Sequence, residues 1–155
     1  MINFLLRRIH DNFIHSAEVV AFCLMPNHYH LIVKILDEKI IIETILKTFI
    51  SYSKAINKSY SRTGHLFEGR FRYKLIPDNN YLLHLSRYIH LNPVRAGLVN
   101  HPSKWEFSSY LNYIGYREDG FIKHQIITEQ VSDYKDFVLS YTVKDYNYIK
   151  DLLIA

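Results

Sequence analysis

Two histidines separated by one residue are the first feature of this sequence that suggests chemistry. His28 and His30 lie in a stretch rich in apolar and β-branched residues, which is typical of a β-strand. Side chains alternate between the faces of a strand, so both imidazoles point to the same side, about 7 Å apart along it. Such a pair can bind one metal cation, although two surface or hydrogen-bonded histidines have the same spacing. The single cysteine, Cys23, argues against a structural zinc site.

A second set of polar residues recurs at helical spacing later in the chain. His84, Tyr88 and Asn92 are each four residues apart, so they share one stripe of a predicted helix. The amide oxygen of Asn92 can serve as a ligand beside the two imidazoles, with Tyr88 over the same ion. Tyr88 is then a candidate nucleophile, but the chain has 13 tyrosines and most must be packing or surface groups. His84 is either a phosphate-orienting group or, more simply, a packed one, and we interpret His90 as structural.

The middle of the chain is basic and aromatic. The formal net charge is +4, and residues 54–95 hold eight basic residues against only Glu68 and Asp78. Interleaved aromatic residues there would provide flat rings for bases, while the cations would bind phosphates, as a single-stranded nucleic-acid surface requires. A solvated helix face followed by an amphipathic strand would produce the same composition. The basic residues are Lys54, Lys58, Arg62, Arg70, Arg72, Lys74, Arg87 and Arg95.

Hydrophobic periodicity predicts the elements that must position these groups. We expect an antiparallel sheet with helices packed on one face, an α+β architecture that is best described as ferredoxin-like or RRM-like. The predicted helices cover residues 3–14, 38–62, 79–91 and 105–114, with one or two more in 128–153. The predicted strands are 18–25, 28–36 and 66–76, of which the first two form a hairpin across Pro26 and Asn27 and the third has one basic face.

Length and composition limit the class of protein. A chain of 155 residues is expected to form one domain, with a motif core at 18–114 and a helical extension at 115–155. An apolar content of 48% with 5 Gly and 4 Pro excludes disordered and low-complexity classes. Neither a secretory signal nor an apolar run of bilayer length is visible, so we expect a cytoplasmic protein without a membrane partner.

Four runs of residues carry a resemblance to a known family. They are AFCLMPNHYHLIV (21–33), GHLFEGRFRYKLI (64–76), RYIHLNPVRAGLV (87–99) and WEFSSYLNY (105–113). In this order they resemble the single-tyrosine HUH transposases of the insertion-sequence-200-like and repetitive-extragenic-palindrome-associated group, over about residues 18–114. HUH denotes two histidines around a bulky apolar residue, and Tyr29 stands at that middle position.

The resemblance implies a mechanism and a site. It makes His28, His30 and Asn92 the metal ligands, with Mg²⁺ or Mn²⁺ as cofactor, and Tyr88 the nucleophile. Such enzymes nick and rejoin single-stranded DNA, often at hairpins, through a 5′-phosphotyrosine, and they are commonly dimers. Candidate contacts to the DNA backbone are Arg70, Arg72, Lys74, Arg87 and Arg95, although Arg95 could equally anchor the end of its helix.

One departure from the family bears on the sheet. Relatives begin with a strand inside the sheet, whereas Met1 leads directly into a helical pattern. We therefore expect a sheet that lacks this first strand, whose exposed backbone groups need a substitute partner such as a second subunit. The competing functions are a non-catalytic nucleic-acid-binding module and a phosphoesterase that releases its product by water attack.

Overall fold

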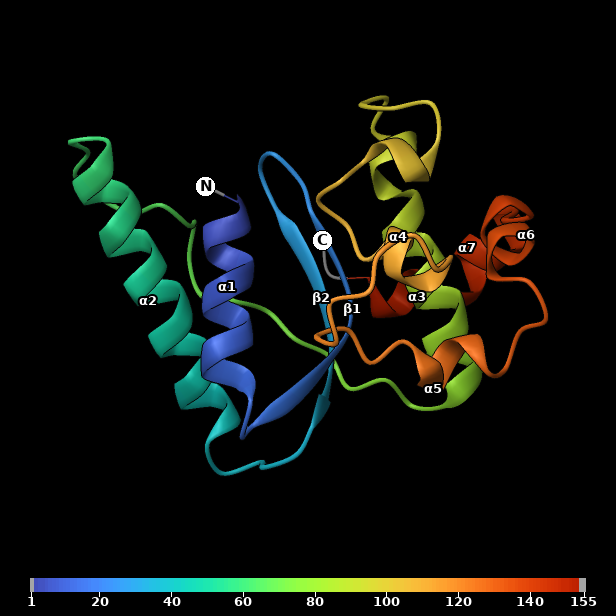
Figure 1. Cartoon of the computed structure of the whole chain (residues 1–155), viewed down its shortest axis with the longest axis horizontal. Helices are drawn as coiled ribbons and strands as arrows, with labels where there is room; N and C mark the ends of the chain where they lie inside the picture. Colours follow the sequence, from blue (N-terminus) through green and yellow to red (C-terminus); the bar gives the residue numbers. More distant parts are fainter. Residues whose placement is uncertain (1, 154–155) are drawn as a thin grey trace. The chain divides into compact units, whose positions relative to one another are not determined.

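The computed structural model describes residues 2–153, and Figure 1 shows the chain coloured along its length. The described residues form seven α-helices and one two-stranded antiparallel sheet, a mixed α+β structure. The chain divides into two compact units. One comprises residues 1–18 and 33–72, and the other comprises residues 19–32 and 73–155.

The first unit is built around a pair of helices. Helix α1 (Ile2–Phe13) packs against helix α2 (Ile41–Ser59), as Figure 1 shows. The apolar positions of α1 recur every four residues, so Leu5, Ile9 and Phe13 form one buried stripe. Polar contacts fix the pair as well, since Asn12 Nδ2 donates a hydrogen bond to Thr48 Oγ1 at 3.0 Å. Both helices were predicted from this periodicity.

The predicted hairpin is also present. Strand β1 (Ala17–Leu24) pairs with strand β2 (Tyr29–Ile35), and the Met25 backbone N–H donates to the His28 carbonyl at 2.8 Å across the turn. Nearly every residue of β1 is buried, because its sequence is apolar on both faces. Strand β2 is only partly buried, and His28 immediately precedes it.

The backbone of β1 finds further partners later in the same chain. Leu24 N–H donates to the Phe107 carbonyl at 2.9 Å, and Ser109 N–H donates to the Phe22 carbonyl at 3.0 Å. Isolated bridges join Cys23 to residue 108 and Val19 to residue 122. The segments 107–109 and 122–123 therefore provide the substitute partners that an unpaired strand edge requires.

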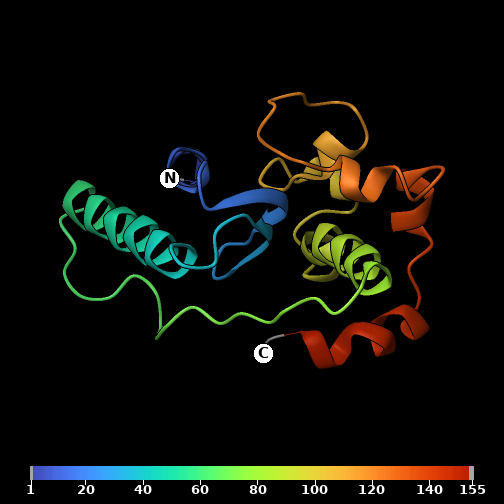
Figure 2. The ribbon, with the colours of Figure 1, turned by 90° about the horizontal axis from the view of Figure 1, so that it is seen from below.

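The prediction of a strand at residues 66–76 is wrong. In the described structure this segment has neither helix nor strand, and Figure 2 shows it as part of a long irregular stretch before residue 79. Gly64 and Gly69 adopt φ values of +88° and +71°, which interrupt extended backbone. Tyr73 and Leu75 are 69% and 76% exposed, so the later part of the apolar face that the alternation suggested is not buried, whereas Phe67 contacts the rings of Phe49 and Tyr52.

The second unit surrounds helix α3 (Asn79–Arg95). The side chain of Asp78 caps this helix by accepting from Tyr81 N–H at 2.9 Å. We predicted an end at residue 91, but the helix continues through the buried Pro93 to Arg95. It ends where Gly97 adopts a φ of +69° and Leu98 N–H donates to the Pro93 carbonyl at 2.9 Å.

Short helices pack around α3. Of the predicted helix 105–114 only α4 (Tyr110–Tyr113) forms, because residues 107–109 bond to β1 instead. The region after 114 holds α5 (Gln125–Thr128), α6 (Tyr134–Leu139), α7 (Val143–Ile149) and the 3₁₀ turn η2 (Lys150–Leu152). Helices α6 and α7 contact α3 directly, and Figure 2 shows α7 on the side of α3 away from α4. A further 3₁₀ turn, η1 (Pro102–Lys104), contacts α3 as well.

A buried polar network stabilises this unit. His90 is completely buried, and its two ring nitrogens lie 2.8 Å from Tyr134 Oη and 2.8 Å from Ser109 Oγ. Tyr134 Oη in turn donates to Ser86 Oγ at 3.0 Å. Every ring nitrogen of His90 is thus occupied, which agrees with the structural role predicted for it.

Among residues 2–153, no helix combines the length and the apolar character that a bilayer crossing demands.

Candidate active site

The two histidines of the HUH run lie together. The ring centroids of His28 and His30 are 5.0 Å apart, with the ring planes at 83°. Alternation along the strand places the intervening Tyr29 on the other face, where burial raises its pKa to about 12. His28 Nδ1 is 2.7 Å from Asn27 Oδ1. When Nδ1 carries the proton of this hydrogen bond, Nε2 presents its lone pair to a ligand.

The electrostatics of His30 favour a neutral ring. Burial, followed by the charge of His28, lowers the pKa of His30 to about 4. A neutral imidazole has a free lone pair at neutral pH, which is the form that binds metal ions.

Tyr88 lies on α3 beside this pair. Its ring centroid is 6.2 Å from that of His30, and the planes meet at 77°. Burial is the main effect on Tyr88 and raises its pKa. The positive charge of Arg95 lowers this pKa, Tyr146 raises it, and the amide of Asn92 lowers it. The phenol is therefore protonated at neutral pH and needs a proton acceptor before it can act as a nucleophile.

Asn92 lies one helical turn beyond Tyr88. Its Nδ2 is buried and has no hydrogen-bond partner of good geometry among the described residues, although its amide is close enough to influence the Tyr88 hydroxyl. An unsatisfied buried amide is costly and points to a missing ligand. A half-turn of the carboxamide exchanges nitrogen for oxygen, and the oxygen suits a divalent cation.

Imidazole and amide groups are donor types that bind divalent metal ions. Within residues 2–153 no cluster of three or more His, Cys, Asp or Glu side chains suited to a metal is formed. The candidate set is instead two imidazoles and one amide, which leaves coordination positions for phosphate and water. Oxygen ligands suit Mg²⁺ and Mn²⁺, and first-row transition metals such as Mn²⁺ also accept nitrogen ligands.

The five basic residues predicted to contact DNA occupy different environments. Arg70 and Arg72 are exposed on the irregular segment before α3. Lys74, also exposed, donates through Nζ to the Asp151 carbonyl. These three side chains are therefore exposed to solvent, where a phosphate can reach them.

Arg87 is buried instead, with 4% of its surface exposed. Its Nη1 donates to the Phe137 carbonyl at 3.0 Å, and its Nη2 is 2.8 Å from His84 Nδ1 and ion-paired with Asp145. Burial and the charge of Arg87 lower the pKa of His84, while Asp145 raises it. Arg87 and His84 thus interact with a carboxylate of the same chain.

Arg95 is exposed and its guanidinium contacts two aromatic rings. Its guanidinium carbon is 4.9 Å from the ring centroid of Tyr88 and 4.9 Å from that of Tyr146. Cation–π contacts of this kind hold both rings in place.

Sequence reasoning missed the contribution of α7 to this region. Asp145 and Tyr146 reach residues of α3, and nothing in their local sequence indicates that contact. One signal was available for the helix itself: Thr142 and Asp145 form a capping box, in which each side chain bonds to the backbone of the other residue.

Comparison with known proteins identifies the family of this chain. The family model described as "Transposase IS200 like" matches residues 5–92, a range that includes His28, His30, Tyr88 and Asn92. A Haemophilus influenzae protein named REP-associated tyrosine transposase is 32% identical over 107 residues, which are 62% of this chain and 60% of the relative. The chain thus matches less than two thirds of that relative's length. No solved structure matches the chain significantly. Because the family model covers more than half of the sequence, the chain belongs to the IS200-like transposase family.

Proposed function

We propose that this protein nicks and rejoins single-stranded DNA, with Tyr88 as nucleophile and with His28, His30 and Asn92 as ligands of Mg²⁺ or Mn²⁺. The observation that carries the proposal is the distance of 6.2 Å between the rings of Tyr88 and His30, whose own ring is 5.0 Å from that of His28. Membership of the IS200-like transposase family supports it independently.

The chain's own residues account for the bond changes. Tyr88 Oη attacks the phosphorus of a phosphodiester in line with the 3′-oxygen, so an O–P ester forms while the P–O3′ bond breaks. The phenolic proton passes to water, and the leaving 3′-oxygen takes up a proton. The products are a 5′-phosphotyrosine and a free 3′-hydroxyl. A bound divalent cation would neutralise the phosphate charge and polarise the phosphorus.

Rejoining follows from the covalent ester. A 3′-hydroxyl that attacks the phosphotyrosine restores a phosphodiester and returns the proton to Tyr88. Because the ester conserves the energy of the original bond, no ATP is needed. Hydrolysis of the same ester would dissipate this energy, so the site must keep water from attacking phosphorus.

The remaining parts of the proposal concern the partners. Arg70, Arg72, Lys74 and Arg95 would bind the phosphates of hairpin DNA, and Arg87 would do so once Asp145 is displaced. We further propose a homodimer and a ferredoxin-like sheet to which the β1–β2 hairpin contributes. Residues 1–155 would act as one transposase-like domain, with its motif core at 18–114.

Covalent capture tests the reaction. The protein is incubated with labelled single-stranded hairpin oligonucleotides and Mn²⁺, and protein-linked DNA is detected by denaturing electrophoresis and mass spectrometry. We expect an adduct with the native chain and with Tyr60→Phe, which changes an exposed tyrosine of the first unit. We expect none with Tyr88→Phe. A normal adduct in Tyr88→Phe would overturn the assignment of the nucleophile.

A non-catalytic nucleic-acid-binding module is the second candidate, favoured by the exposed Arg70 and Arg72 on the irregular segment before α3. Salt-sensitive DNA binding without an adduct, unchanged in His28→Ala, would support it. A nick without protein-linked DNA would instead indicate a phosphoesterase.

A further inference from the structure

A pocket of about 330 Å³ lies among the short segments of the second unit. Residues of η1, α4 and α6 form part of its wall, together with residues just outside these elements. A volume of this size is sufficient for a small organic molecule. None of the lining residues belongs to the candidate active site, so a ligand here would occupy a site of its own.

Three tyrosines line this pocket. Tyr113 and Tyr134 are buried, with ring centroids 4.5 Å apart, whereas Tyr116 is 80% exposed. Tyr113 Oη donates to the Val20 carbonyl at 2.9 Å, and Tyr134 Oη donates to Ser86 Oγ at 3.0 Å. Because these two hydroxyls are used elsewhere, the buried tyrosines have their rings left to contact a ligand. The faces of such rings carry partial negative charge and attract cations.

The pocket also holds a carboxylate that no cation of the described chain neutralises. Asp133 Oδ1 accepts from the Asp136 backbone N–H at 3.0 Å and so caps α6. Among the described residues, no ion pair joins Asp133 to a basic side chain. Lys135 lines the same pocket but is exposed and forms no ion pair with it. A negative charge therefore lies unbalanced beside three aromatic rings.

A buried hydroxyl is affected by this charge. Tyr110 is completely buried, and its Oη has no hydrogen-bond partner among the described residues. Its ring contacts that of His101, another lining residue, at a centroid distance of 6.3 Å. Burial, and then the charge of Asp133, raise the pKa of Tyr110. The field of the carboxylate thus reaches the wall behind the pocket, where nothing in the described chain cancels it.

We propose that this pocket binds a small aliphatic ammonium ion, of the chemical class of the diamines and polyamines. Asp133 would form the ion pair, the three tyrosine rings would add cation–π attraction, and the methylene groups would contact Ile114. An anion would instead meet a carboxylate and the negative faces of rings. The inference does not depend on the proposed strand transfer, since binding is measured without DNA.

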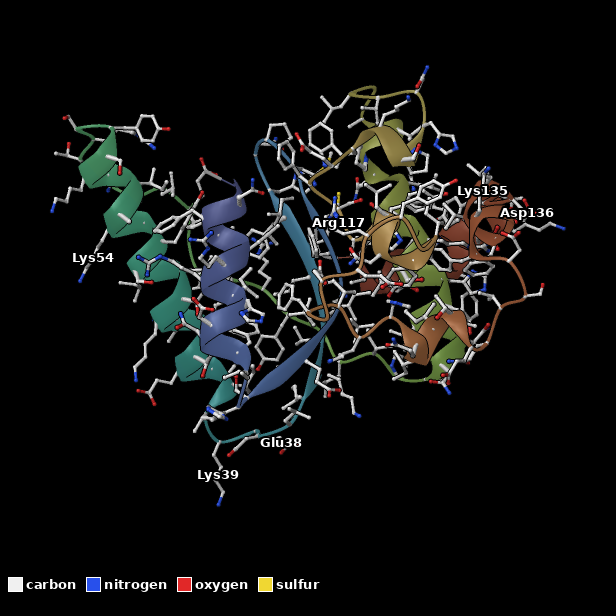
Figure 3. All side chains as sticks on the ribbon, viewed as in Figure 1. Glu38, Lys39, Lys54, Arg117, Lys135 and Asp136 are labelled. Atoms are coloured by element: carbon white, nitrogen blue, oxygen red, sulfur yellow. The ribbon has the colours of Figure 1, made fainter. Side chains whose placement is uncertain are left out.

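Charge removal gives the first test. Putrescine is titrated into the native chain and into Asp133→Asn by calorimetry at fixed salt. Asparagine caps a helix as well as aspartate, so α6 keeps its start. We expect binding at least tenfold weaker in the variant, a change of roughly 1.4 kcal/mol. Asp136→Asn is the matched control, because it removes the same charge outside the pocket, where Figure 3 shows Asp136 at the surface. Equal weakening in both variants, or none in Asp133→Asn, would overturn the inference.

The exposed ring gives the second test. Tyr116→Ala should weaken putrescine binding several-fold, whereas Tyr116→Phe, which keeps the ring, should bind like the native chain. Since Tyr116 is 80% exposed, neither change removes a buried side chain. A loss as large in the phenylalanine variant as in the alanine variant would contradict a contact made by the ring.

The opposite charge at the pocket gives the third test. Lys135→Gln removes a positive charge from the wall and should tighten putrescine binding, because the lysine repels a cation there. Weaker binding in this variant would mean that Lys135 holds the ligand. The pocket would then be an anion site, and the inference would be wrong.

Nuclear magnetic resonance locates the bound amine. In the ¹⁵N-labelled native chain, putrescine should shift the backbone resonances of residues 113–116 and 133–135 and leave those of residues 28–30 in place. Shifts confined to other segments would overturn the inference, as would a native chain that shows no binding at millimolar putrescine.

Discussion

The ring of Tyr88 meets the ring of His30 edge-on, with centroids 6.2 Å apart and planes at 77°. One ring comes from a strand and the other from a helix late in the sequence. Each is positioned by a simple periodicity: alternation brings His30 to the same face as His28, and the helical repeat brings Tyr88 into line with Asn92. The packing of the strand against the helix is what brings the two rings together.

Asn27 should affect the affinity for a metal ion through its contact with His28. Because Asn27 Oδ1 lies 2.7 Å from His28 Nδ1, its removal frees the ring to rotate and to change tautomer. We expect Asn27→Ala to lower the affinity for Mn²⁺ by about 10- to 100-fold. Calorimetric titration with Mn²⁺ measures the change, and Asn100→Ala, at an exposed position, serves as control. An unchanged affinity in Asn27→Ala would argue that His28 does not bind the metal in this orientation.

His90 should make stability depend on pH. Burial lowers its pKa from 6.5 to about 3 in the folded chain, so the folded state disfavours the charged ring. Its stabilising contribution is complete above pH 6.5 and is lost progressively as the pH falls toward 3, because the unfolded chain takes up the proton first. The loss is at most roughly 1.4 kcal/mol per pH unit for one group.

The measurement compares native and variant chains. Urea unfolding of the native chain and of His90→Gln is followed between pH 7 and about pH 4, a range set by this linkage. The variant should be less stable at pH 7, yet the gap between the two should narrow as the pH falls. Parallel curves would show that His90 does not titrate in the expected direction.

Much of the scaffold could be predicted because its signals are local. The stripe of Leu5, Ile9 and Phe13 is sufficient to predict α1, and the apolar run that forms β1 is sufficient to predict a buried strand. The shared face of His28 and His30 follows from the same rule. These signals indicate which face of an element a side chain occupies. The distance of 5.0 Å between the rings of His28 and His30 confirms the prediction that both lie on one side.

The features that a short stretch of sequence does not indicate are tertiary in origin. Residues 66–76 alternate like a strand, but no described strand pairs with them, and Leu75 remains 76% exposed. Arg87 is as basic in sequence as Arg70, yet an ion pair with Asp145 buries it. Neither outcome is encoded within a short window, because each depends on which distant segment packs nearby.

Cys23 should be chemically inert in the folded chain. The side chain is completely buried in β1, and burial raises the pKa of its thiol from 9.0 to about 12. Since the thiolate is the reactive form, a disulfide reagent should modify it about a thousandfold more slowly than a free thiol at pH 8. Timed labelling followed by mass spectrometry measures the rate. Full reactivity should return in urea, and rapid labelling without urea would mean that β1 opens locally.

Gly97 should control how α3 ends after Asn92. Its φ of +69° lies in the left-handed region, and no atom lies within 4 Å of the position that a Cβ would take, so the cost of a side chain there is backbone strain rather than collision. We expect Gly97→Ala to destabilise the chain by about 1–2 kcal/mol. Gly97→Asn should cost less, because asparagine tolerates this conformation better than alanine. Since the Cβ of either residue has open space around it, the order of the two variants in thermal unfolding isolates the backbone strain. If alanine proved as stable as glycine, the helix would have to end in another conformation, and the position of Asn92 one turn earlier would need to be reconsidered.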